Sequence, residues 1–375
     1  MQFTMPFFLI GLLPWFIVVF ILVRSIPKGR KALLLFANVL FYLWGNIGAF
    51  LIMLAYCCLV WAFSSLLAKQ RNKTLFAVTI VASVLPLIAF KYLGFLIQNF
   101  NALFQFDLRG PNWILPLGIS FVTFQAVSLL SDIFTRKIKR APAFLDTILY
   151  LTFFATITSG PIMRYTEFEP ELKTSHPVID LGASLEKVMI GLCKKTLIAD
   201  KLSFLADYYF DGTAQGLVLS GAGLWIGSIT FTLQLYFDFS GYCDMAIGIG
   251  GLMGFKIPEN FNGPYLSKSI VEFWRRWHMT LSRWFRDDVY IPPRRESLPR
   301  RTSYSQFTDC LAFNRDLAWL RLCVHRMEAR LFPITCRREI PSFYEICRRK
   351  MVQPFLRDVF CESPVDSIQN GESGK

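Results

Sequence analysis

The sequence predicts an all-α, polytopic transmembrane protein. Hydrophobic residues make up 53% of its 375 residues, 37 residues are Phe, and apolar stretches recur from the first residues onward. A helix needs about 20 residues to cross the hydrocarbon core of a bilayer. Stretches of about that length occupy residues 7–23, 32–49, 50–68, 74–90, 113–130, 144–163, 216–237 and 241–255.

The first stretch is expected to be an uncleaved span. It lacks the basic flank and the small-residue cleavage site that are typical of a signal peptide. Basic residues cluster between spans at 24–31, 69–73 and 136–140. By the positive-inside rule, all three clusters are predicted to be cytoplasmic and the N-terminus to lie outside.

Charge and cysteine content exclude several other classes. The net charge is +13, but the basic residues are distributed among the loops, so we expect no nucleic-acid partner. The cysteines show neither a CxxC pair nor metal-ligand spacing. We therefore predict neither a disulfide framework nor a metal site.

Two segments are predicted not to cross the membrane. Residues 184–210 alternate lysines with apolar residues at helical spacing, which indicates an amphipathic helix at the cytoplasmic interface. Residues 164–180 are polar and contain Pro170 and Pro177, so they are expected to form a loop.

A Trp- and Arg-rich segment follows the last predicted span. One helix face would carry Trp274, Trp277, Leu281 and Trp284, because these residues are three or four apart. Arg275, His278 and Ser282 would lie on a neighbouring face. One interpretation is an interfacial helix with Trp and Arg at the level of the lipid headgroups. The other is a re-entrant helix lining a polar cavity, where His278 and arginines meet a charged substrate.

Two carboxylates lie in an apolar context just before this segment. Asp238 and Asp244 are six residues apart, and Ser240 and Gly241 between them favour a break between two helices. Ionisable groups at membrane depth are functional candidates, because leaving them in lipid is costly. Both could instead cap helices or pair with Lys or Arg. In the other hypothesis, one of them orients a catalytic group.

Several longer motifs occur in order between residues 113 and 292. They are LPLGISFVTFQAVSLLSDIF, ITSGPIMRYTEF, YFDFSGYCDMAIGIGGLMGF, NFNGPY and EFWRRWHMTLSRWFRDDVYIP. Together they resemble the membrane-bound O-acyltransferase family, most closely its alginate O-acetyltransferase-like branch, and the N-terminal spans resemble it more weakly. The resemblance implies a many-helix fold with re-entrant or interfacial helices around a polar tunnel, in the inner membrane of a bacterial cell.

The reaction that the resemblance implies is transfer of an acyl group, usually acetyl, to hydroxyls of an exported polysaccharide such as alginate. We expect no bound cofactor, an acyl donor such as acetyl-CoA or another acyl thioester, and two partners besides membrane lipid: the polysaccharide and a periplasmic acetyltransferase protein. Other acceptors would be peptidoglycan or a teichoic acid that receives D-alanine. A non-enzymatic carrier is the alternative class, but the inverted repeat that would favour it is not found.

The resemblance also assigns site residues. His278, in WRRWH, matches the second histidine of the family and is the predicted catalytic residue. The predicted substrate-binding residues are Asp238, Tyr242, Asp244, Trp274, Arg275 and Trp277. A hydroxyl is a weak nucleophile and needs a general base. The family's principal histidine lies in a Trp-His-Gly motif that this chain lacks, because neither His176 nor His325 has that context.

The family pattern ends near Pro292. Residues 1–292 are predicted to form the acyltransferase domain, and 293–375 a basic, poorly ordered tail. Where the family continues Leu-Gly-Gly-Asn-Arg, this chain reads Pro-Arg-Arg-Glu-Ser. A one-nucleotide shift within the codon for Pro293 permits that family sequence and, further on, Trp-His-Gly. We therefore expect a frameshift and an inactive chain, the alternative being a genuine basic tail.

Overall fold

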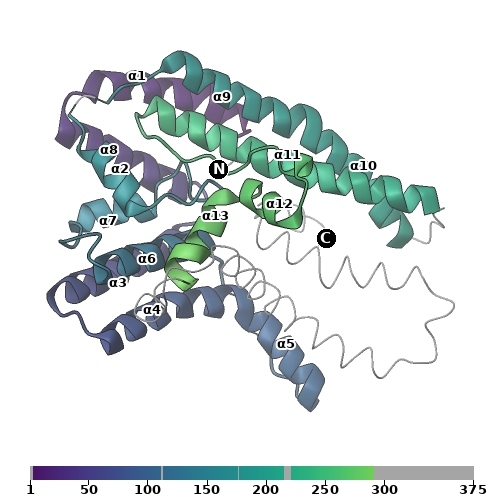
Figure 1. Ribbon diagram of the computed structural model, residues 1–375, viewed down its shortest axis with the longest axis horizontal. Helices are drawn as coiled ribbons and strands as arrows, with labels where there is room; N and C mark the ends of the chain where they lie inside the picture. Colours follow the sequence, from purple (N-terminus) through teal and green to yellow (C-terminus); the bar gives the residue numbers. More distant parts are fainter. Residues whose placement is uncertain (1–2, 111–112, 176, 215–220, 291–375) are drawn as a thin grey trace, which may run out of the picture. The chain divides into compact units, whose positions relative to one another are not determined.

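The computed structural model describes residues 3–110, 113–175, 177–214 and 221–290, and every regular element in these ranges is helical (Figure 1). The predicted all-α class is confirmed for this part of the chain. The α-helices in the first half are α1 (Leu13–Val23), α2 (Pro27–Leu43), α3 (Ile47–Lys69), α4 (Lys73–Leu87), α5 (Leu93–Phe104), α6 (Ile119–Phe134) and α7 (Phe144–Leu151). Those that follow are α8 (Tyr165–Lys173), α9 (Leu181–Cys193), α10 (Asp200–Ala214), α11 (Gly221–Leu252), α12 (Ile270–Arg276) and α13 (Met279–Trp284).

Short turns of π- or 3₁₀-helix extend or join these helices. They are η1 (Phe7–Leu12), η2 (Ile88–Tyr92), η3 (Lys194–Ala199), η4 (Pro264–Leu266) and η5 (Phe285–Tyr290). The predicted tail, 293–375, lies outside the described residues.

The chain forms two compact units. Among the described residues, the first contains those of 3–198 and 240–284, and the second contains those of 199–239 and 285–290. In the second unit, α10 packs on the first part of α11, with the rings of Phe210 and Phe231 5.6 Å apart. The candidate site lies in the first unit.

The first unit is built around α3, α4 and α6, which pack against one another. The helices Ile47–Lys69 and Lys73–Asn101 are long and apolar enough to cross a membrane. They agree with the predicted spans 50–68 and 74–90. Two further apolar helical segments, Phe7–Val23 and Ile119–Phe134, are shorter. The segment Phe7–Val23 has the bounds predicted for the first span, whereas the boundaries of the remaining predicted spans differ from the helices.

The C-terminal end of the predicted span 32–49 is wrong, because α2 ends at Leu43 and the chain turns before α3 begins at Ile47. The Asn46 side chain accepts hydrogen bonds from the backbone N–H groups of Gly48, at 2.7 Å, and Ala49, at 3.2 Å. An asparagine that satisfies these first N–H groups is a strong helix start. The polar residue inside an apolar run therefore marks a helix boundary.

The predicted span 144–163 is also wrong, because α7 ends at Leu151. The side chain of the buried Asn38 of α2 forms hydrogen bonds with the chain just after that end. Its Nδ2 donates to the Thr152 hydroxyl at 3.1 Å, and its Oδ1 accepts from the Phe154 N–H at 3.1 Å. A backbone N–H that is bonded to this side chain no longer takes part in a helix. The following residues form buried turns that pack inside the unit.

The predicted break at Ser240 and Gly241 is absent, since α11 runs continuously from Gly221 to Leu252. A Cβ atom on Gly241 would lie 2.8 Å from the Gly191 carbonyl oxygen of α9. The glycine therefore permits a close approach of two helices rather than a turn.

The segment predicted as a loop at 164–180 contains α8. Glu167 caps this helix by accepting the Arg164 N–H at 3.1 Å. Tyr165, Phe168 and Leu172 form its buried face. Burial of this apolar face stabilises a helix despite Pro170. The prediction of helix for 184–210 is confirmed by α9, η3 and α10.

The three basic loops lie close together, as the positive-inside interpretation requires. The Arg71 guanidinium donates to the Ile133 carbonyl at 2.9 Å, which places the loop after α3 beside the end of α6. Lys31 pairs with Asp146 in the first turn of α7 at 2.7 Å. The 136–140 loop connects the same two helix ends. Figure 1 shows these helix ends on the left. The assignment of this side to the cytoplasm stays a prediction.

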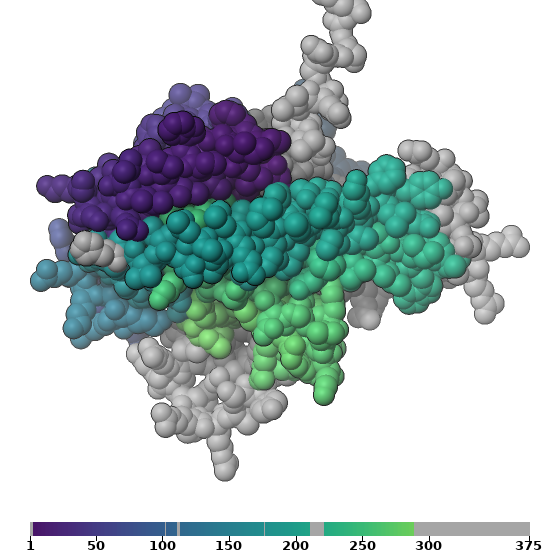
Figure 2. Space-filling view, turned by 90° about the horizontal axis from the view of Figure 1, so that it is seen from above, coloured from purple at the N-terminus to yellow at the C-terminus, as the bar shows by residue number. Residues whose placement is uncertain are grey.

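Large apolar side chains cover parts of the outer surface of the first unit. On the N-terminal helical segment, Ile10 is 79% exposed and Trp15 74%, and on α9, Met189 is 56% exposed. Figure 2 shows the N-terminal helical segment in purple and α9 in teal on one face. Such outward apolar surface is typical of helices that contact lipid.

Candidate functional site

The predicted Trp/Arg helix is interrupted at His278. α12 ends at Arg276, α13 begins at Met279, and His278 has a left-handed backbone with φ 45°. Trp274 and Trp284 therefore lie on separate helices, and the predicted single face is wrong. The preceding chain causes the interruption, because the Asn260 carbonyl accepts the Met279 N–H at 2.9 Å and the Asn262 N–H donates to the Arg276 carbonyl at 3.0 Å.

His278 is held by the side chain of Asn260. The two residues are 3% and 0% exposed, and Asn260 Oδ1 lies 3.0 Å from His278 Nδ1. The same oxygen accepts from the Thr280 backbone N–H at 3.2 Å and from its hydroxyl at 2.9 Å. One amide oxygen thus organises the turn that carries the histidine.

Further hydrogen bonds connect this pair to two other segments. Asn260 Nδ2 donates to Cys243 Sγ of α11 at 3.3 Å, and Cys243 Sγ donates to the Ser159 carbonyl at 3.6 Å. The Ile162 N–H donates to the Thr280 hydroxyl at 3.0 Å. We refer to His278, Asn260, Thr280 and Cys243 as the His278 network. It joins three separate stretches of sequence in one buried cluster.

His278 is neutral in this environment. It lies outside the apolar spans, and burial lowers its pKa to about 3. The physical cause is desolvation, because a charged imidazolium would lose its hydration in this buried position. A neutral imidazole has one donor nitrogen and one acceptor nitrogen. The site can therefore both give and receive one hydrogen bond at this ring.

Contacts of α13 hold the turn in place. The Arg283 guanidinium contacts both carboxylate oxygens of Glu167 on α8, at 2.7 and 3.3 Å. The Trp284 indole N–H donates to the Phe124 carbonyl of α6 at 2.9 Å. A bidentate Arg–carboxylate pair is geometrically specific. α13 is thus attached to two neighbouring helices, which restrains His278 beside it.

Asp244 is an ion-pair residue. Its carboxylate lies 2.5 Å from Lys194 and 3.1 Å from Lys187, and Lys187 also contacts Glu259 at 3.0 Å. The Asp244 side chain is 8% exposed. This is the pairing alternative from the sequence, and it links α11 to α9 and η3. A substrate-binding role for Asp244 stays a prediction.

The other predicted substrate-binding residues do not share one environment. Tyr242 contacts the Thr158 hydroxyl and stacks on Phe3, with ring centroids 4.9 Å apart. Trp277 is 4% exposed and packs on Phe273 at 5.5 Å. These contacts are typical of packing residues. Their predicted substrate contacts are not tested by this geometry.

The remaining three predicted residues differ from the buried His278 either in how far they are buried or in the unit to which they belong. Arg275 is exposed and Trp274 half-buried, whereas His278 is buried. Asp238 is half-buried and belongs to the second unit. Continuity of α11 places Asp238 and Asp244 on different faces of one helix, because six residues correspond to about 600° of rotation.

Asn260, Thr280 and Cys243 were not predicted as site residues. Asn260 lies in NFNGPY, a motif noted only for its family resemblance. It lies between Glu259 and Phe261, so its immediate neighbours give no signal of a site. Its partner lies 18 residues away, a separation at which sequence spacing does not indicate contact.

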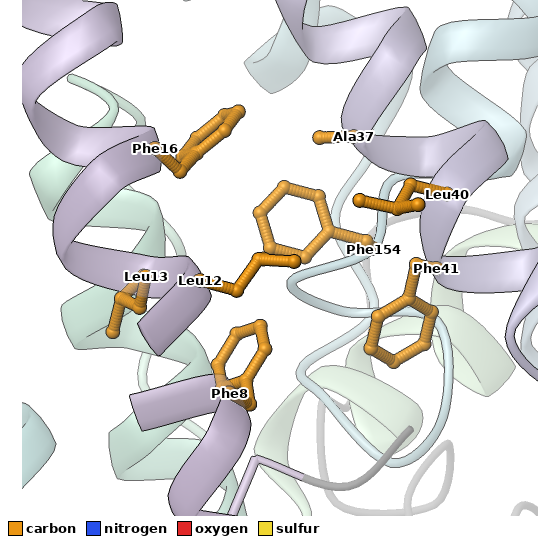
Figure 3. Close-up of a pocket in the computed structure, with 8 residues that line it drawn as sticks. All are labelled: Phe8, Leu12, Leu13, Phe16, Ala37, Leu40, Phe41 and Phe154. Atoms are coloured by element: carbon orange, nitrogen blue, oxygen red, sulfur yellow. The ribbon is translucent and has the colours of Figure 1, made fainter. Parts of the chain in front are cut away.

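A small pocket of the first unit is lined by none of these residues. Its lining is entirely apolar, and Phe154 points between α1 and α2 (Figure 3). The other lining residues are Phe8, Leu12, Leu13, Phe16, Ala37, Leu40 and Phe41. Among the described residues, no group of three His, Cys, Asp or Glu side chains is placed to hold a metal ion. The polar tunnel stays a prediction.

Residues 29–308 match the model of the MBOAT, membrane-bound O-acyltransferase, family. The chain is 34% identical to the probable alginate O-acetylase AlgI of Pseudomonas aeruginosa over 301 residues, which are 78% of this chain and 57% of that protein. It is 34% identical to the peptidoglycan O-acetyltransferase of Helicobacter pylori, covering 77% of this chain and 61% of that one. It is also 34% identical to the teichoic acid D-alanyltransferase of Bacillus subtilis, covering 60% of this chain and 55% of that one.

The chain thus spans about three fifths of the length of the first two relatives. The matched region contains the whole first-unit site, from α6 to α13. The predicted resemblance is confirmed by the family model and by these relatives. The chain belongs to the membrane-bound O-acyltransferase family.

Proposed function

We propose that the chain is a membrane O-acyltransferase that transfers an acetyl group to hydroxyls of an exported polysaccharide, with alginate as the first candidate acceptor. The observation that carries the proposal is the buried, neutral His278 inside the family-matched region. The similarity to a probable alginate O-acetylase over 78% of the chain supports the acceptor.

The pKa of His278 indicates which part of the reaction it serves. A general base works best when its pKa is near the operating pH. A pKa of about 3 makes His278 a weak base at neutral pH. The ring is better suited to accept a hydrogen bond from the acceptor hydroxyl and hold it beside the acyl carbonyl. Positioning of this kind contributes to the rate without a proton transfer.

The proton of the attacking hydroxyl then needs a second group. In the family resemblance that group is the histidine of Trp-His-Gly, a motif that is absent from this sequence. We therefore expect the 375-residue chain to be inactive. The one-nucleotide frame change that permits Trp-His-Gly is expected to supply the missing base.

The donor and partner belong to the same proposal. An acyl thioester such as acetyl-CoA would deliver the acetyl group from the cytoplasmic side. A periplasmic acetyltransferase protein would pass it to the polysaccharide. Contacts of Arg71 with Ile133 and of Lys31 with Asp146 bring the basic loops together. They support placing the C-terminal end of α6 and the N-terminal end of α7 on one side of the membrane. Assignment of that side to the cytoplasm of a bacterial inner membrane rests on the positive-inside rule.

Two other acceptors follow from the relatives. Peptidoglycan is favoured by an identity of 34% to a peptidoglycan O-acetyltransferase, equal to that of the alginate relative. A teichoic acid with D-alanine is favoured less, because that match covers 60% of the chain. Alginate and peptidoglycan would both carry an acetate ester and teichoic acid a D-alanyl ester, so the three polymers are separated before their esters are measured.

The test expresses the chain in a strain that lacks its own acetylase. Ester-bound acetate on exported polysaccharide and on peptidoglycan is measured, together with D-alanine on teichoic acid. We expect no ester from the chain as it stands and acetate on the polysaccharide from the frame-repaired form. In the repaired form, His278→Gln removes this positioning and is expected to lower acetylation roughly 100-fold.

Two results would contradict the proposal. Full acetylation by the unrepaired chain would show that the absent histidine is dispensable. An ester on peptidoglycan or teichoic acid alone would replace the polysaccharide as acceptor. Asn262→Ala serves as a matched control in the repaired form, because Asn262 is exposed and next to the same turn.

A further inference from the structure

We infer that Asn260 is a positioning residue that locks His278 in the tautomer with its proton on Nδ1, leaving Nε2 as the acceptor nitrogen. The inference rests on the proposed function for its consequence, which is that a hydroxyl can donate to this ring. Its evidence is the geometry of the His278 network, together with the neutral charge of the buried ring.

The first step is the orientation of the Asn260 amide. The backbone N–H of Thr280 can only donate, and it meets Asn260 at 3.2 Å. A flipped amide would place an NH₂ group against this donor. The atom facing Thr280 is therefore the carbonyl oxygen, and Nδ2 faces Cys243 Sγ at 3.3 Å, which can accept a weak hydrogen bond.

The second step is the proton on the imidazole. Nδ1 of His278 lies 3.0 Å from this oxygen, which has no hydrogen to donate. A hydrogen bond between the two requires Nδ1 to carry the proton. Because burial keeps the ring neutral, the remaining nitrogen, Nε2, then holds the lone pair.

The third step is the rigidity of the arrangement. Asn260 holds the turn through both its side chain and its main chain, because its backbone carbonyl also accepts the Met279 N–H at 2.9 Å. His278 adopts a φ of 45°, an uncommon conformation for a non-glycine residue. The main-chain bond stabilises that conformation while the side-chain bond sets the tautomer. A hydroxyl donor requires this tautomer, since an Nε2–H ring could not accept from it at Nε2.

The test is nuclear magnetic resonance of the full chain in detergent, with ¹⁵N in its histidine rings. Long-range ¹H–¹⁵N spectra distinguish a protonated ring nitrogen from an unprotonated one. His278→Gln identifies the signals of His278 among those of the three histidines. We expect protonated Nδ1, unprotonated Nε2 and no titration between pH 8 and about 5, because the pKa is about 3.

Variants of Asn260 then test the cause. Asn260→Ala removes the acceptor, so the ring is expected to populate both tautomers, while its titration midpoint stays low because the desolvation that lowers it remains. Asn260→Asp keeps an acceptor oxygen and adds a negative charge, so it should restore the Nδ1–H form and raise the midpoint. Asn262→Ala removes the other asparagine side chain of the NFNGPY motif, which lies outside the network, and should leave the spectrum unchanged.

An Nε2–H tautomer in the unmodified chain would overturn the inference, whatever the variants do. An unchanged tautomer in folded Asn260→Ala would equally overturn it. Neither result depends on acetylation. If the tautomer is as expected and no ester is formed by the repaired chain, the proposed function fails and the positioning role of Asn260 stands.

Discussion

Two neighbouring residues of α11 belong to clusters of opposite chemistry. Cys243 joins the His278 network, in which a neutral ring is held by uncharged hydrogen bonds. Asp244 joins two lysines in an ion-pair cluster against α9 and η3. Buried charge is tolerated only when it is paired. The two lysines that stabilise the buried charge of Asp244 also take up its carboxylate oxygens. The neutral network instead holds a histidine whose ring can form hydrogen bonds.

The largest expected effect is on the ion-pair cluster. Asp244→Ala leaves Lys187 and Lys194 without their shared carboxylate, and breaking a buried pair from one side costs about 3–5 kcal/mol. The lysine side chains are 32% and 27% exposed, so we expect the lower end of this range. Chemical unfolding in detergent micelles measures it.

Glu169→Ala is the control for this loss, because Glu169 pairs with Lys173 at 2.6 Å on one helix surface. Such an exposed pair contributes about 0.5 kcal/mol or less. Equal losses for the two variants would show that the Asp244 cluster is no more important for stability than an ordinary surface pair.

The next effect concerns the close packing that the ion pairs bridge. Gly191→Ala would place a Cβ atom 2.5 Å from the Gly241 carbonyl oxygen and 2.7 Å from the Met245 nitrogen. Neither backbone atom can move without displacing its helix. We expect a loss of about 1–3 kcal/mol in the free energy of unfolding.

Gly94→Ala on α5 is the matched control, because nothing lies within 4 Å of the position that the new methyl group would occupy. There the lower backbone entropy of Ala in the unfolded chain should stabilise the protein by about 0.5–1 kcal/mol. A stabilising Gly191→Ala would show that α9 and α11 do not pack as closely as described.

The pH dependence of stability separates the network from the ion pairs. The folded pKa of His278, about 3, lies below the ordinary value of 6.5, so the unfolded chain binds the proton more readily. Its contribution to stability is complete above pH 6.5 and is lost as the pH falls toward 3. At pH 5 the loss is about 2 kcal/mol, at ~1.4 kcal/mol per pH unit.

His278→Gln isolates this contribution, since the variant retains every carboxylate of the chain. Unfolding at pH 7.5 and pH 5 is compared between the two proteins. The unmodified chain should lose about 2 kcal/mol more than the variant. An equal loss in both would show that His278 is not held neutral by the fold.

The smallest effect is expected at Cys243. Cys243→Ser keeps a group that accepts from Asn260 Nδ2 and donates to the Ser159 carbonyl, so the expected cost is below about 1 kcal/mol. Cys243→Val has a similar shape but leaves the Asn260 donor buried and unbonded, which costs about 1–3 kcal/mol. Equal costs for Ser and Val would indicate that Cys243 contributes by packing alone.

The helical class and several helices could be predicted from local sequence. The long apolar runs of α3 and of Lys73–Asn101 leave little alternative to helices that hide their backbone from lipid. His278 was a candidate from its motif alone. Boundaries at Asn46 and after Leu151 were missed, because each depends on one side chain that binds a particular backbone N–H.

The sequence by itself determined which parts this protein contains: apolar helices, basic loops, and a histidine inside a family motif. Tertiary structure decided how these parts act. Gly241 next to Ser240 favours a break locally, but α9 packs against that glycine and α11 continues through it. A regular helix is favoured locally at His278, but the backbone of residues 260–262 takes the hydrogen bonds there and interrupts it. In both places a contact between distant segments outweighs a local preference of about 1 kcal/mol.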